Sequence, residues 1–98
     1  MNKLYSFIWG VCEKMEINQA DIFGSSRKTR VSDARKMISF WAITNGFLID
    51  EIAFILDKHR TSIYYCIKRH RELMKIDRKY KNRYAAILKK YRNDVSET

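Results

Sequence analysis

Apolar residues recur at helical spacing along almost the whole chain. In the first segment they follow a period of about 3.6 residues and mark one face of a helix. That face consists of Leu4, Phe7, Ile8, Val11 and Met15. Similar faces start near positions 32, 50, 60 and 77, and a short turn of helix starts at Asn18 or Asp21. No segment alternates apolar and polar residues beyond a few positions, so the pattern predicts an all-α domain of five to six helices.

Polar breaks separate the helical segments. Segment 24–30 is small, polar and basic and is expected to form a loop, with Ser32 capping the helix that follows. Gly46 suits the end of that helix, and residues 57–59 interrupt the apolar period again. Asp77 is the expected cap of the last helix.

The length of 98 residues and an apolar content of 46% suit a single domain with one core. We divide it into an N-terminal helix over 1–16, a main region over 17–92 and a frayed tail over 93–98. The residues expected in the core include Met37, Ile38, Trp41, Cys66, Tyr80, Tyr84 and Tyr91. His70 falls on a buried stripe and is expected to be a hydrogen-bonded structural histidine.

The charge of the chain points to an anionic partner. Twenty Lys and Arg residues against eleven Asp and Glu residues give a formal net charge of +9. Eighteen of the basic residues but only six of the acidic ones lie between Arg27 and Arg92. The last two-thirds of the chain therefore carry the basic character, which is typical of nucleic-acid-binding proteins.

Several other classes of protein do not fit the sequence. The longest stretch without a charged residue, 37–49, is too short to span a bilayer. Cys12 and Cys66 lie far apart in the sequence and form no C-x-x-C motif, which suggests reduced thiols in a cytoplasmic protein. His59 and His70 do not pair with them at a spacing typical of zinc sites. Phosphate-binding glycine loops, carboxylate pairs and nucleophile–base pairs are missing from the sequence, so we predict a protein that is not an enzyme and holds no metal or cofactor.

Two adjacent segments fit a helix-turn-helix. Ile52, Ala53 and Leu56 precede the polar turn, and Ile63 and Cys66 follow it, so that small and aliphatic residues lie where two helices would brace each other. The second helix then carries cationic and hydroxyl side chains near its N-terminal half, namely Arg60, Thr61, Ser62, Tyr65, Lys68 and Arg69. Such side chains read base edges or bind phosphates in a major groove, although a merely solvated helix face has the same composition.

The basic loop before this pair of helices supports a DNA-binding interpretation. Arg27, Lys28 and Arg30 form a cluster of the kind that enters a minor groove, where arginine suits the negative potential. The alternative is an ordinary soluble loop.

The order of these features is similar to that of a known family. Ala20-Asp21-Ile22 precedes the loop with Arg27, Ala34-Arg35-Lys36-Met37 opens the long helix, and Glu51-Ile52-Ala53 lies in the bracing helix. Over about residues 17–92 the chain resembles the C-terminal DNA-binding domain of the bacterial replication initiator DnaA, whose fold is all-helical and Trp-repressor-like. The resemblance implies binding of double-stranded DNA, related to replication-origin binding or its regulation, in a bacterial or phage-encoded protein of the nucleoid.

The match to the family's recognition motif is loose. Lys58-His59-Arg60-Thr61-Ser62-Ile63 stands where the family has R-D-H-T-T-V. The resemblance implies that Arg27 enters the minor groove, that His59, Arg60 and Thr61 read bases, and that Lys58 contacts a phosphate or a base. Two of the base-reading positions differ from the family, and Asp57 alone aligns with its paired glycines, so we expect a changed recognition site or weak specificity. The ATPase module of the initiator has no counterpart in the chain.

Tyr5 and Trp9 lie one turn apart on the first helix, away from its apolar stripe. If exposed, they would form an apolar spot for a homodimer or a protein partner, while the helix itself is expected to fold back on the domain. A protein-interaction adaptor built on a helix-turn-helix scaffold is therefore the competing function. Binding of RNA by the basic last helix ranks third.

Overall fold

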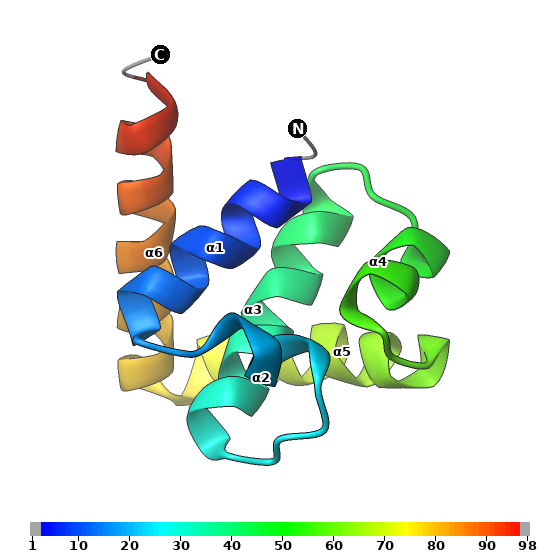
Figure 1. The fold of residues 1–98 in the computed structure, drawn as a ribbon. Coiled ribbons are helices and arrows are strands. Elements are labelled where there is room, and N and C mark those ends of the chain that lie inside the picture. The colour runs from blue at the N-terminus through cyan, green and yellow to red at the C-terminus, as the bar shows by residue number, and fades with distance from the viewer. Residues whose placement is uncertain (1–2, 97–98) are drawn as a thin grey trace.

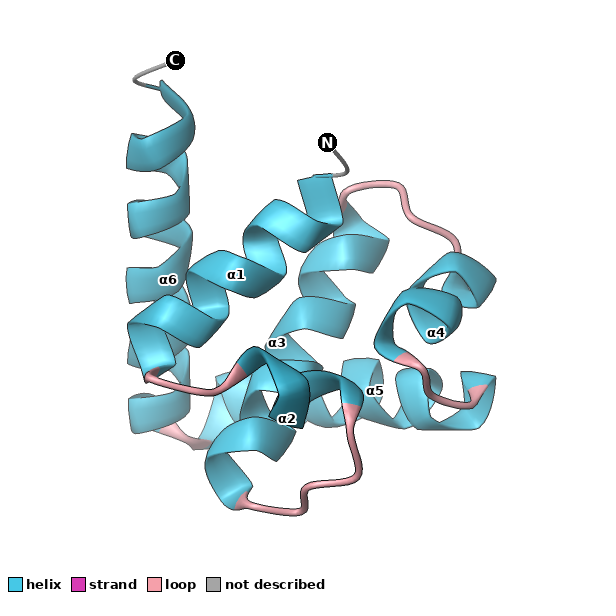
Figure 2. Cartoon of the chain, in the orientation of Figure 1, coloured by secondary structure: helices cyan, strands magenta, loops and turns pink. Residues whose placement is uncertain are grey.

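Six helices form the computed structural model, which describes residues 3–96, with side chains as far as Tyr91 (Figure 1). They are α1 (Lys3–Met15), α2 (Gln19–Phe23), α3 (Thr29–Thr44), α4 (Ile49–Leu56), α5 (Arg60–Ile76) and α6 (Arg78–Ser96). Loops alone connect them, and residues 3–96 contain no strand (Figure 2). The all-α prediction is confirmed.

Helix α3 is the centre of the fold. It packs against α1, α2, α4 and α5, and α6 stands beside α1 and the end of α5 (Figure 1). Met37 and Ile38 are fully buried and Trp41 is nearly so, as the sequence predicts. Because α3 contacts two helices that precede it in the chain and two that follow it, it lies at the centre of the core.

Helix α1 folds back onto the domain through its apolar stripe. All five residues of the predicted face are buried. The rings of Phe7 and Trp41 stack with their centroids 4.2 Å apart, and Tyr91 of α6 meets both rings edge-on at 5.4 Å. Lys90 of α6 and Glu13 of α1 form an ion pair of 2.9 Å that also links these two helices. Aromatic packing therefore connects three helices at this end of the core.

A second aromatic cluster surrounds His70 on α5. Its Nδ1 lies 2.6 Å from the hydroxyl of Tyr80, its ring stacks on Phe40 at 4.3 Å, and Tyr84 meets it edge-on at 4.6 Å. His70 and Tyr80 are almost completely buried. The expectation of a hydrogen-bonded structural histidine is confirmed.

Two of the predicted boundaries are wrong. Helix α3 begins at Thr29, three residues before the predicted cap Ser32, whose hydroxyl instead accepts a hydrogen bond from Lys36 within the helix. The extra turn forms because it buries Val31 against the core. Helix α6 continues to Ser96, so the predicted tail is helical as far as that residue, and the last two residues of the tail, 97–98, lie outside the described residues.

Candidate nucleic-acid interface

A three-residue turn, 57–59, joins α4 to α5. Asp57 ends α4 in the left-handed conformation, with φ at 55°, and the next amide, that of Lys58, donates to the carbonyl of Ala53 at 2.9 Å. An aspartate tolerates this conformation better than most residues other than glycine, which explains how it can occupy a left-handed position where glycine is common. Behind the turn, the side chains of Leu56 and Ile63 are buried. The geometry fixes the start of α5 against the end of α4.

His59 caps the start of α5. Its Nδ1 accepts a hydrogen bond from the amide of Thr61 at 3.2 Å and lies 3.1 Å from the Thr61 hydroxyl. The cap satisfies one of the free N–H groups of the first turn. Two residues expected to read bases therefore contact each other at the tip of the helix, where both remain exposed.

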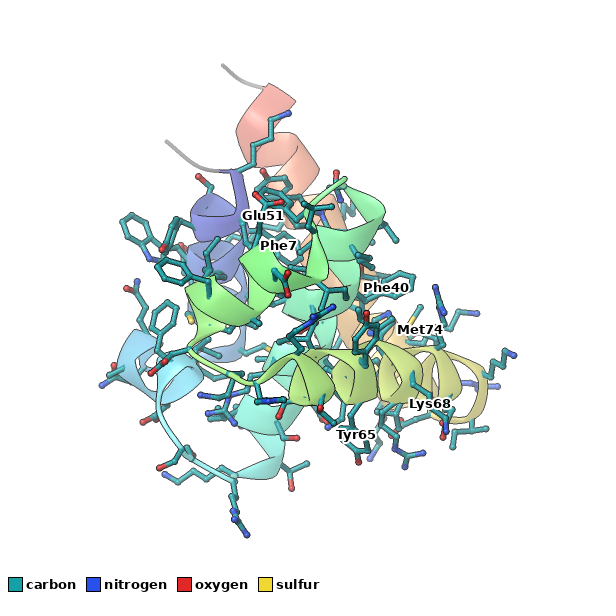
Figure 3. The ribbon with its side chains drawn as sticks, turned by 90° about the vertical axis from the view of Figure 1, so that its right-hand side faces the viewer. Phe7, Phe40, Glu51, Tyr65, Lys68 and Met74 are labelled. Carbon is teal, nitrogen blue, oxygen red and sulfur yellow. The ribbon has the colours of Figure 1, made fainter. Side chains whose placement is uncertain are left out.

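One side of α5 faces solvent along its length. At roughly 100° per residue, Thr61, Tyr65 and Lys68 fall on one stripe, opposite the buried Ile63 and Ile67. In Figure 3, Tyr65 and Lys68 lie on the lower side of α5, and Phe40 and Met74 lie on its upper side. Ser62 is exposed beside this stripe. Four of the predicted contact residues are therefore available to a ligand on one helix face.

Two predicted cations on α5 already have acidic partners. Arg60 Nε lies 2.9 Å from Asp50 at the start of α4, and Arg69 lies 3.0 Å from Glu72. Sequence reasoning did not consider Glu72, which follows Lys68 by one turn and places a carboxylate on the exposed stripe. Exposed ion pairs contribute about 0.2–1 kcal/mol, so a phosphate could replace either carboxylate as the partner.

The loop between α2 and α3 carries Arg27 and Lys28, both exposed. Arg30 differs from the expectation because it belongs to the first turn of α3, where it donates to the carbonyl of Met15 at 3.4 Å. Only the first two basic residues of the cluster therefore belong to the loop.

Arg35 of α3 holds this loop in place. Its guanidinium donates four hydrogen bonds of 2.6–3.0 Å, and their acceptors are the carbonyls of Asp21, Ile22, Gly24 and Ser26. Burial lowers the pKa of Arg35 from its ordinary value. Sequence reasoning noted Arg35 only as part of a family motif and missed this role, because backbone acceptors leave no pattern in a sequence.

Lys58 binds the same segment from the other side. Its ammonium donates to the carbonyls of Phe23 at 3.0 Å and Gly24 at 2.6 Å, and to that of Asp57 at 3.4 Å. Burial, and then the nearby charge of Arg35, lower the pKa of Lys58. The side chain expected to contact a phosphate or a base is directed into the protein and links the turn before α5 to the end of α2.

A cleft of about 420 Å³ lies between the beginning of α3 and the exposed part of α5. Its lining residues are Ser32, Arg35, Leu56, Lys58, Thr61, Ser62, Ile63, Tyr65 and Cys66. Burial raises the pKa of the Cys66 thiol, which keeps it protonated at neutral pH. The cleft therefore has an apolar floor and a polar rim, and Arg35 and Lys58 on that rim are already hydrogen-bonded.

Among the side chains that the structure describes, those of residues 3–91, no group of three from His, Cys, Asp and Glu is arranged to hold a metal ion. In the same part of the chain, no helix combines the length and the apolar character that crossing a bilayer requires.

Comparisons of the sequence with models of protein families and with characterised proteins found no match. The functional interpretation therefore rests on the residues and their geometry.

Proposed function

We propose that this chain binds double-stranded DNA as a helix-turn-helix domain related to the C-terminal domain of DnaA. Helix α5 would enter the major groove, and the loop with Arg27 and Lys28 would lie in the adjacent minor groove. The role is binding without catalysis, at replication origins or in their regulation, in the bacterial cytoplasm or nucleoid.

One observation carries this proposal. Arg35 and Lys58 together donate six hydrogen bonds to carbonyls of residues 21–26, so the end of α2 and the first residues of the basic loop are fixed beside the start of α5. A basic loop that only served solubility would not need such a restraint. A loop that must meet the minor groove while α5 lies in the major groove would benefit, because less conformational entropy is lost on binding.

The roles of the predicted contact residues follow from their positions. Thr61, Ser62, Tyr65 and Lys68 are exposed on α5 and would contact bases or phosphates. Arg60 and Arg69 would exchange their carboxylate partners for phosphates, while Lys58 would act as a positioning residue. His59 would orient Thr61 and present its other ring nitrogen to the DNA.

Fluorescence anisotropy with labelled duplexes at several salt concentrations tests the proposal. A DnaA-type site, a scrambled site, a random duplex and a single strand make up the panel. If about six phosphates are neutralised, log K should fall with log salt at a slope of about −5. Absence of duplex binding at low salt would refute DNA binding. Equal affinity for every duplex would refute sequence recognition and leave a basic architectural protein.

Point variants then separate the two contacts. Arg27→Ala should weaken binding most at sites with a narrow, A·T-rich minor groove. Thr61→Ala should change the sequence preference selected from a random pool. Lys89→Ala is the matched control, because this exposed lysine belongs to the C-terminal half of α6. That half of the helix lies far from the loop between α2 and α3 (Figure 1). If Thr61→Ala leaves the preference profile unchanged, α5 is not the recognition helix.

A further inference from the structure

A group of exposed apolar side chains lies outside the proposed DNA-binding surface. On α1, Trp9 is 46% exposed and Tyr5 is 36% exposed, and on α4, Phe54 is 85% exposed. Tyr5 and Phe54 line the same hollow of about 480 Å³, together with Asp50, Glu51 and Ile55. Trp9 follows Tyr5 by one helical turn and lies on the same side of α1. We call these residues the α1–α4 groove.

The groove and the proposed DNA-binding surface face different ways. In Figure 3, Glu51 of the groove lies on the upper side of α5, whereas Tyr65 and Lys68 lie on its lower side. Duplex DNA is a poor occupant of the groove, because Asp50 and Glu51 repel phosphate and the remaining lining is apolar. Large aromatic side chains with this exposure are typical of protein-binding sites.

The backbone of the groove indicates a helical partner. Both walls are α-helices, whose main-chain groups are bonded within each helix, so neither wall offers a strand edge. A partner that buries apolar side chains here must satisfy its own backbone, and an amphipathic helix does this. The rings of Tyr5, Trp9 and Phe54 would then meet anchors at positions i, i+3 or i+4, and i+7 of that helix.

The charge of the groove indicates the sign of the partner. Asp50 and Glu51 both line it, and α4 contains no Lys or Arg, although the chain carries a net charge of +9 and Asp50 also pairs with Arg60 at the start of α5. A second copy joined through the same patch would bring the carboxylates of the two copies together and add the repulsion between two basic domains. Lysine or arginine on a helix of another protein would instead meet the opposite charge of these carboxylates. The repulsion between that helix and the basic residues elsewhere on this domain is largely screened beyond about 8 Å at physiological salt.

We propose that the α1–α4 groove binds a basic amphipathic helix of another protein. The hydrophobic side of that helix would cover Trp9 and Phe54, and its flanking cations would lie against Asp50 and Glu51. This interaction leaves the loop and the exposed side of α5 free.

Selection from a displayed library of helix-forming peptides tests this inference. Each peptide has 18 residues, and its flanking positions are random. Its anchor positions i, i+3, i+4 and i+7 are restricted to apolar residues in one half of the library and random in the other half. We expect the selected peptides to carry cationic flanks. A synthetic copy should lose at least tenfold in affinity against the Trp9→Ala/Phe54→Ala variant. Ile76→Ala is the matched control, because this side chain is 72% exposed and lies at the C-terminal end of α5, outside the groove. A version of the peptide with glutamate flanks should bind at least tenfold more weakly.

Three results would overturn the inference. The first is that selection enriches no peptide. The second is that the enriched peptides bind the double variant as tightly as the wild type. The third is that light scattering shows a dimer of the wild type that is lost in the double variant. Both substitutions are at exposed positions, and circular dichroism checks that the fold is kept. Duplex affinity of the double variant should equal that of the wild type, so failure of this inference is distinguishable from failure of DNA binding.

Discussion

Burial of His70 makes the stability of the domain depend on pH. Burial, and then the charge of Arg71, lower the pKa of His70 from 6.5 to about 4. Burial also raises the pKa of Tyr80, so its hydroxyl stays protonated and shares one hydrogen bond with Nδ1. Nε2 is buried and has no hydrogen-bond partner among the described residues. Protonation would therefore put a charge at a site where only Nδ1 has a partner.

The magnitude follows from the difference between the two pKa values. In the unfolded chain His70 binds a proton at about pH 6.5, and in the folded chain only at about pH 4. Between these pH values the unfolded state therefore binds more protons than the folded state. Stability is complete above about pH 6.5 and falls as the pH is lowered. The loss is about 2 kcal/mol at pH 5 and about 3 kcal/mol below pH 4.

Urea denaturation followed by circular dichroism, at pH values from 7.5 to 4.5, measures this term. The His70→Leu/Tyr80→Phe variant removes the titrating ring and its hydroxyl partner together. Its stability relative to the wild type should improve by about 2 kcal/mol between pH 7 and pH 5. Ile76→Ala is the control, since this exposed side chain has no titratable group and its loss should retain the wild-type pH dependence. Parallel curves for the wild type and the double variant would refute the reasoning.

Three further predictions concern the candidate interface. Arg35→Met removes four hydrogen bonds to α2 and the loop that follows it. It should lower the free energy of unfolding by about 1–3 kcal/mol, measured in urea, and weaken duplex binding as well. Unchanged values for both would mean that the loop needs no restraint. Glu72→Gln removes a carboxylate from the exposed stripe and should raise duplex affinity about two- to fivefold by anisotropy, with equal affinity counting against contact of this stripe with DNA. Cys66 in the cleft should react with a disulfide reagent before the buried Cys12, whose pKa burial raises to about 11, and bound duplex should slow the reaction. Equal rates with and without duplex would place the DNA away from the cleft.

Periodicity was sufficient to predict the helices, because each one buries a continuous apolar stripe. The stripe from Leu4 to Met15 is buried in full, and Asp77 caps α6 through a hydrogen bond from the amide of Tyr80. The boundary of α3 was predicted less well. A serine followed by an aspartate has the pattern of a cap, but burial of Val31 extends the helix by one more turn.

The candidate interface was predictable only where it depends on helix faces. Thr61, Tyr65 and Lys68 share a face because of their spacing, and the sequence contains that spacing. The roles of Lys58 and Arg35 depend on carbonyl groups that are 9–35 residues away in the chain. Backbone acceptors belong to every residue type, so composition and motifs cannot identify which cation they bind.

Acidic residues are concentrated on helix α4, which lies between the proposed DNA-binding surface and the α1–α4 groove. Asp50, Glu51 and Asp57, three of the six acidic residues between positions 27 and 92, lie on this helix or directly after it. Their position leaves the loop and the exposed side of α5 with an excess of cations, and it gives the α1–α4 groove the opposite sign. The ion pair between Asp50 and Arg60 connects the two surfaces, because a cationic partner that binds Asp50 releases Arg60 for a phosphate. The same carboxylate would therefore favour a basic helix in the groove and restrain one cation of the proposed recognition helix, and this coupling would be limited to about 1 kcal/mol because the pair is exposed.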